Sequence, residues 1–125
     1  MLEFIYCEEI LFDLPPPTLF CRGDLIGFEQ LKKVIENMII EQNEICLNNC
    51  DFVIITETTK KIIFRPFSNQ ILLKITDTEI ITDISIKDWG IILDYLKEIL
   101  SSKNSLTYFF EFENYIEEGN FVLES

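Results

Sequence analysis

The sequence predicts an α+β fold: a mainly antiparallel sheet of about six to seven strands, with two helices packed on one face. Two segments have apolar residues at helical spacing, and the segments around them alternate apolar and polar residues as strands do. Helices and strands do not alternate one by one, which argues against a doubly wound parallel sheet. The expected order of elements is ββαββββαβ, with room for one more strand at the end. A chain of 125 residues is expected to form a single domain over residues 1–125.

Two strands are expected at the start of the chain. Residues 2–12 alternate, with Leu2 and Phe4 among the apolar residues on one side. Three consecutive prolines at 15–17 cannot join a regular sheet and form an extended connector. Residues 18–22 then form a second, short strand.

Two helices are expected, at residues 25–42 and 86–102, because apolar residues recur there on one helical face. Asp24 suits the N-cap of the first helix, and Ser85 opens a capping box before the second. Gly90 lies inside the second helix, where it costs about 1 kcal/mol relative to alanine. We therefore expect close packing against the sheet at that position.

Four strands are expected between the helices, as an antiparallel meander. These segments are rich in β-branched residues and are separated by polar turns. They are residues 52–56, 62–67, 71–75 and 80–84. Residues 106–113 form the strand that follows the second helix, and residues 121–123 are expected as a short edge strand.

The charge balance limits the classes of partner. The chain has 22 acidic and 10 basic residues, a net charge of −12 and a pI near 4.3. Phosphates and anionic membranes repel such a chain, so direct binding to nucleic acid or membrane is not expected. No apolar run reaches the roughly 20 residues that span a bilayer, and the first residues lack the basic groups of a signal peptide. We expect a cytoplasmic protein.

Metal and cofactor sites are not expected. The four cysteines are even in number, but in the cytosol they are expected to stay reduced. Cys46 and Cys50 form a lone pair without the further ligands of a zinc site. The acids Asp77, Glu79 and Asp83 lack the spacing of a calcium loop and are more typical of a hairpin turn.

Enzymatic chemistry is not expected either. The chain has no histidine, which removes Ser-His and Cys-His nucleophile pairs. Glu8 and Glu9 are neighbours on a strand and point to opposite faces, so they cannot act as an acid–base pair. Glu111 and Glu113 share a face but have no predicted cleft.

Acidic and aromatic residues gather at the two ends of the chain. Residues 1–21 and 104–125 contain no lysine or arginine. The rings of the first end are expected to face the core, whereas the last strand and the tail turn both kinds of residue outward. Aromatic anchors beside carboxylates are typical of an inhibitor of a basic enzyme, and the alternative is an acidic surface that serves only solubility. The candidate partner-binding residues are Phe109, Glu111, Glu113, Tyr115, Glu117 and Glu118.

Four segments in chain order carry a resemblance to a known family. They are residues 19–24 (LFCRGD), 28–31 (FEQL), 85–89 (SIKDW) and 108–112 (YFFEF). The chain resembles the small cytosolic immunity proteins of bacterial polymorphic or contact-dependent growth inhibition toxin systems. The resemblance implies an antidote that binds a cognate toxin, often a basic nuclease domain, and either blocks its active site or binds elsewhere on it.

Two other classes stay open from the sequence. An acidic secretion chaperone would bind a segment of an effector, and a phage-encoded inhibitor would bind a defence nuclease. The family resemblance brings no catalytic residues to this chain. The sequence leaves both a monomer and a dimer open.

Overall fold

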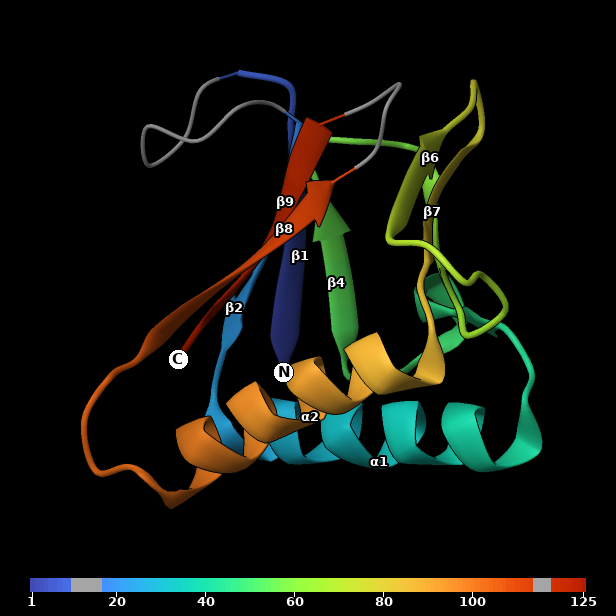
Figure 1. The fold of residues 1–125 in the computed structure, drawn as a ribbon. Helices are drawn as coiled ribbons and strands as arrows, with labels where there is room; N and C mark the ends of the chain where they lie inside the picture. The colour runs from blue at the N-terminus through green and yellow to red at the C-terminus, as the bar shows by residue number, and fades with distance from the viewer. Residues whose placement is uncertain (10–16, 114–117) are drawn as a thin grey trace.

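A computed structural model describes residues 1–9, 17–113 and 118–125, with only the backbone described at residues 112, 113 and 118. These parts of the chain hold two α-helices, nine strands in two mixed sheets and one short 3-10 helix. The predicted α+β class is confirmed. The two sheets face each other, and both helices lie across one end of the space between them (Figure 1).

The larger sheet has the strand order β4-β1-β2-β9-β8. Its strands are β1 (Leu2–Cys7), β2 (Thr18–Gly23), β4 (Val53–Thr56), β8 (Thr107–Glu113) and β9 (Glu118–Glu124). Strands β1 and β2 are antiparallel, as are β8 and β9, whereas β4 runs parallel to β1 and β9 runs parallel to β2. The first and last strands of the described chain therefore belong to one sheet.

The smaller sheet has the order β3-β5-β7-β6. Its strands are β3 (Ile45–Cys46), β5 (Lys61–Arg65), β6 (Leu72–Ile75) and β7 (Glu79–Asp83). The predicted meander is wrong, because β4 belongs to the other sheet and β5 pairs in parallel with β7. Apolar alternation specifies which face of a strand is buried, but it does not specify the neighbouring strand. The 3-10 helix η1 (Leu47–Asn49) separates β3 from β4.

Helices α1 (Leu25–Glu41) and α2 (Ile86–Ser101) end within one residue of the predicted bounds. The Asp24 carboxylate accepts a 2.7 Å hydrogen bond from the N–H of Gly27 and caps α1. Ser85 Oγ accepts a 3.2 Å bond from the N–H of Asp88 and caps α2. The expected close packing at Gly90 is wrong, since a Cβ there would have no heavy-atom neighbour within 4 Å.

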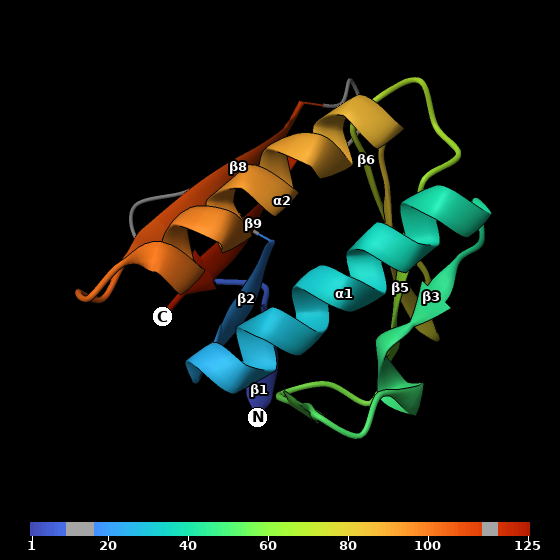
Figure 2. The ribbon, with the colours of Figure 1, turned by 90° about the horizontal axis from the view of Figure 1, so that it is seen from below.

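The helices do not cover one face of a single sheet, as the sequence suggested. They lie side by side at the end of both sheets, with α2 along β8 and α1 crossing from β2 towards β5 (Figure 2). Their apolar faces belong to the same core as the inner faces of both sheets. This arrangement follows from the two-sheet architecture, because the space between two sheets stays open to water at its ends unless other elements close it.

Phe64 of β5 lies at the centre of the core. Its ring lies 4.8 Å from that of Trp89 in α2, and 5.7 and 6.2 Å from those of Phe121 and Phe4 in the larger sheet. All four rings are fully buried. The Trp89 indole N–H also donates a 2.9 Å hydrogen bond to the Arg65 carbonyl, which fixes the start of α2 against β5. One aromatic cluster thus joins both sheets and a helix.

The tail strand β9 is longer than predicted and is not at an edge. It lies between β2 and β8, and Phe121, Val122 and Leu123 are each at most 1% exposed. Consecutive buried apolar residues are typical of a strand that is covered on both faces. The two edge strands of the larger sheet are therefore β4 and β8.

Candidate partner-binding surface

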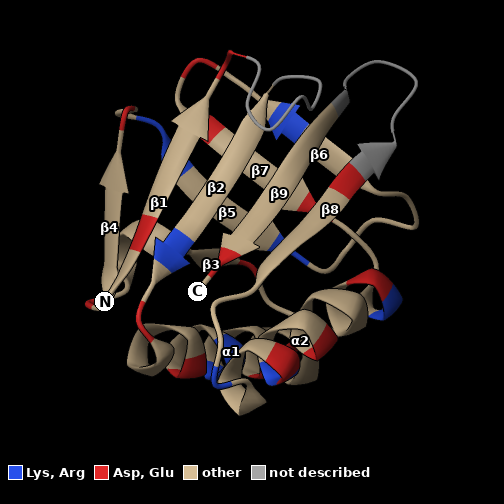
Figure 3. Cartoon of the chain, turned by 90° about the vertical axis from the view of Figure 1, so that its left-hand side faces the viewer, with Lys and Arg blue, Asp and Glu red and all other residues tan. Residues whose placement is uncertain are grey.

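The face of the larger sheet that is turned away from the smaller sheet is here named the outer face. Neither helix lies over it, and in Figure 3 it is turned towards the viewer with both helices below. Leu2 and Phe4 of β1 point into the core, so Glu3 and Ile5 point to the outer face. Register partners on neighbouring strands point to the same side of a sheet. The pairing of the five strands therefore identifies which residues of β2, β4, β8 and β9 also point to the outer face.

Phe109 and Glu111 are the predicted site residues whose side chains the structure describes. They are two residues apart on β8 and lie opposite Val122 and Asn120 of β9, on the outer face. Phe109 is 41% exposed and Glu111 is exposed, whereas Phe110 between them is buried. The predicted alternation of β8 is confirmed at these positions.

The other predicted site residues are described only in part or not at all. Glu113 and Glu118 are backbone partners at the end of the β8–β9 ladder. Their side chains lie outside the described part of the chain, and Tyr115 and Glu117 lie outside it entirely. The sequence prediction for these four residues stays a prediction.

The side chains in the middle of the outer face are buried. Phe20 of β2 is 7% exposed, and Thr18, Asn120 and Val122 are at most 1% exposed. A partner that approaches this face therefore reaches side chains at its margins. One margin is β8 with Phe109, and the other lies at the end of the sheet near the helices.

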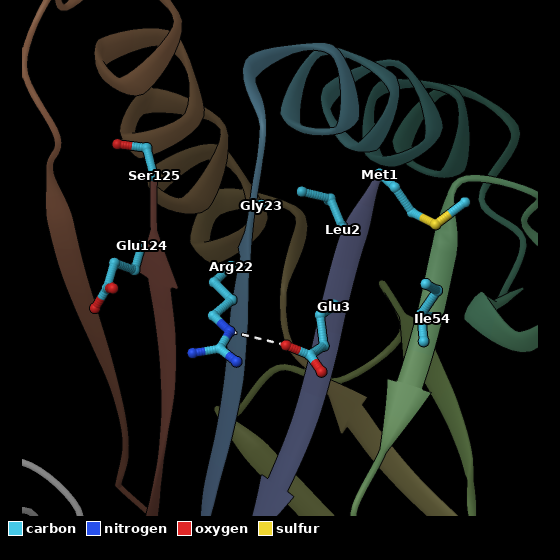
Figure 4. Close-up of a pocket in the computed structure, with 8 residues that line it drawn as sticks. All are labelled: Met1, Leu2, Glu3, Arg22, Gly23, Ile54, Glu124 and Ser125. Carbon is cyan, nitrogen blue, oxygen red and sulfur yellow. Dashed lines mark hydrogen bonds and ion pairs between the residues drawn. The ribbon is translucent and has the colours of Figure 1, made fainter.

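A shallow hollow of about 470 Å³ lies at this second margin (Figure 4). It is lined by Met1, Leu2, Glu3, Arg22, Gly23, Ile54, Glu124 and Ser125. Ile54, Glu3, Arg22 and Glu124 form one row across four adjacent strands, since each is the register partner of the next. Sequence reasoning did not find this row, because its members are brought together only by the pairing of strands far apart in the chain.

An ion pair lies in the middle of the hollow. Arg22 Nε donates a 2.8 Å hydrogen bond to Glu3 Oε1, and Thr56 Oγ1 donates a 3.2 Å bond to Glu3 Oε2. The bond from Arg22 holds the pKa of Glu3 below its ordinary value of 4.5. Glu3 is therefore ionised at neutral pH. Glu124 makes no ion pair with any residue in the described ranges.

Three titratable groups of the described chain have pKa values that are shifted away from catalytic use. All four cysteines have free thiols, and burial raises the pKa of Cys21 and of Cys50, which opposes thiolate formation. The pKa of Asp24 is lowered by the N-terminal ammonium and by the N–H of Gly27, the opposite of what a general acid needs. Within the described ranges, no three His, Cys, Asp or Glu side chains lie close enough together to hold a metal ion.

Comparison with family models, with curated proteins and with solved structures finds no match for this chain. In the part of the chain that the structure describes, no helix has the length and apolar character to cross a membrane. The outer face offers carboxylates and exposed apolar side chains at two separate margins.

Proposed function

We propose that this chain is a toxin-neutralising immunity protein that binds a cognate, basic toxin domain in the cytoplasm through the outer face. The observation that carries the proposal is the margin at β8, where 41%-exposed Phe109 lies two residues from exposed Glu111 on a face that neither helix covers. The partner-binding set also includes Glu113, Tyr115, Glu117 and Glu118, on the sequence argument alone.

The two kinds of side chain have different tasks in this proposal. Carboxylates on a chain of net charge −12 attract a basic partner from a distance and speed its association. Phe109 excludes water at the contact and slows dissociation. In a nuclease toxin the carboxylates would take the positions of substrate phosphates.

Association kinetics test the proposal directly. The probe is the protein encoded by the gene adjacent to that of this chain, mixed with the wild type and with Glu111→Lys at low and high salt. We expect association of the wild type to slow steeply with added salt, and Glu111→Lys to associate several-fold more slowly at low salt only. Phe109→Ala should raise the dissociation rate roughly ten-fold.

Glu41→Lys is the matched control. Glu41 is also exposed and acidic, but it ends α1, away from the outer face. Equal association rates for Glu111→Lys and Glu41→Lys would show that β8 is not part of the interface. Failure of the wild type to bind the protein encoded by the adjacent gene would overturn the immunity function, and capture of an effector segment or of a defence nuclease would favour the chaperone or the phage inhibitor instead.

A further inference from the structure

The hollow presents three kinds of group in a fixed order (Figure 4). Glu124 of β9 lies on one side, the Arg22–Glu3 pair lies in the middle, and Met1 and Ile54 lie on the other side. Met1 and Ile54 are 53% and 47% exposed, so each offers apolar surface to a partner. The hollow therefore has a charged side and an apolar side.

The middle of the hollow offers hydrogen-bond donors beside an ion-paired carboxylate. Both carboxylate oxygens of Glu3 already accept hydrogen bonds, from Arg22 and Thr56. Arg22 uses its Nε for this bond, and none of its bonds within the described ranges uses the two terminal guanidinium nitrogens. These two nitrogens are available to carbonyl groups of a bound backbone.

The charged side favours a cation. Glu124 has no ion-pair partner among the described residues, and the net charge of −12 disfavours an anionic occupant. An arginine or lysine of a partner beside Glu124 would complete a row of alternating charge that begins at Glu3 and Arg22. A carboxylate in the same place would face Glu124 directly.

The spacing of the row determines which segment fits. Ile54 and Glu124 are three strand spacings apart, which is about 14 Å at about 4.8 Å per spacing. An extended peptide rises about 3.3 Å per residue, and residues i and i+4 lie on the same side about 13 Å apart. A basic residue and an apolar residue at this separation can therefore reach both sides of the hollow together.

We infer that the hollow binds an extended segment of the partner in which an arginine or lysine lies four residues from a large apolar residue. The cation pairs with Glu124, the apolar residue packs on Ile54 and Met1, and Arg22 donates to the backbone between them. The identity of the partner as a toxin rests on the proposed function, whereas the chemistry of the segment rests on the hollow.

The first test uses a defined peptide and the backbone amide signals of the full chain in nuclear magnetic resonance. The probe is the capped pentapeptide Arg-Ser-Gly-Ser-Leu, which has the i, i+4 spacing. We expect saturable shifts at Glu3, Arg22, Ile54 and Glu124. The controls are Arg-Leu-Ser-Gly-Ser, which has the same composition with adjacent residues, and Glu-Ser-Gly-Ser-Leu, which reverses the charge. Equal shifts with all three peptides, or shifts away from the hollow, would overturn the inference.

The second test uses variants at the two sides of the hollow. Glu124→Gln and Ile54→Ser should each lower the affinity for the arginine peptide by about five-fold. Since the two side chains are about 14 Å apart, the double variant should show the product, about 25-fold. Glu41→Gln and Ile40→Ser make the same changes at exposed positions of α1 and should have no effect. Ile54 is exposed and Glu124 is partly exposed, so folding should survive, and circular dichroism checks this.

The two proposals fail in different ways. If the toxin domain binds the wild type but binds Glu124→Gln and Ile54→Ser equally well, the inference about the hollow is wrong and the proposed function stands. If the wild type binds no toxin but its hollow saturates with the arginine peptide, the proposed function is wrong and the segment chemistry stands. If the peptide causes no shifts at the hollow, the inference is wrong whatever the toxin does.

Discussion

Gly27 and Gly90 allow a direct test of the packing, because the same substitution should have opposite effects at the two positions. Both glycines lie within helices, and neither has a positive φ. A Cβ at Gly90 would meet no heavy atom within 4 Å. A Cβ at Gly27 would lie 2.8 Å from Leu2 Cγ and 3.0 Å from the Met1 carbonyl carbon, which is closer than side chains tolerate.

The magnitudes follow from these distances. Gly90→Ala should gain the helix-propensity difference, about 1 kcal/mol, or about 4 °C in melting temperature for a chain of this size. Gly27→Ala gains at most the same amount but must displace Leu2, which is fully buried, or the backbone of Met1. Overpacking costs about 1–3 kcal/mol, so we expect Gly27→Ala to be about 1 kcal/mol less stable than the wild type.

Urea unfolding followed by fluorescence measures both variants, since the single tryptophan, Trp89, is fully buried. A difference of about 2 kcal/mol separates the two midpoints by about 1 M urea. In a Leu2→Ala background the added methyl of Gly27→Ala should lose most of its penalty, because Leu2 Cγ and Cδ2 are gone and only the contact with the Met1 carbonyl carbon remains. Equal shifts for Gly27→Ala and Gly90→Ala would show that propensity alone decides, and a destabilising Gly90→Ala would show that its surroundings are not open.

Three further predictions concern the core, a helix cap and the hollow. Phe64→Leu should cost about 1–3 kcal/mol in urea unfolding because it removes three ring contacts, whereas Phe67→Leu at a 55%-exposed position should change stability by less than about 0.5 kcal/mol. Ser85→Ala should cost about 1 kcal/mol and Ser85→Thr, which keeps the hydroxyl, much less, and an equal loss for the two variants would contradict the capping role. Arg22 lowers the folded-state pKa of Glu3, so the stability that this pair contributes is present above about pH 4.5 and is lost as the pH falls further. Glu3→Gln should therefore flatten the decline of the urea midpoint in that range. An unchanged pH profile in this variant would count against the pair.

Local signals were sufficient to predict the helices and most strands of this chain. Asp24 and Ser85 start the two helices as capping residues do, and the alternation around Phe109 predicts which side of β8 faces outward. Pairing was harder, because nothing in residues 53–56 distinguishes a strand beside β1 from one beside β5. The parallel pairs β1–β4, β2–β9 and β5–β7 all join segments that no short turn connects.

The tail carried a signal that points to its true position. Three consecutive apolar residues from Phe121 to Leu123 indicate a strand buried on both faces, and an edge strand would leave one of these faces in water. The hollow had no comparable signal. Glu3, Arg22 and Glu124 are ordinary charged residues in the sequence, and only the register of β1, β2 and β9 makes them neighbours.

The parallel pairing of β2 with β9 also has a consequence for synthesis of the protein. Thr18 and Asn120 are register partners although about one hundred residues separate them in the chain. Such distant pairing slows folding, and on a ribosome the larger sheet cannot close until β9 has left the exit tunnel. Glu124 joins Arg22 only at that moment, so a nascent chain without β9 lacks the complete hollow. A partner that requires the hollow would therefore select molecules in which β9 has paired with β2 over shorter nascent chains.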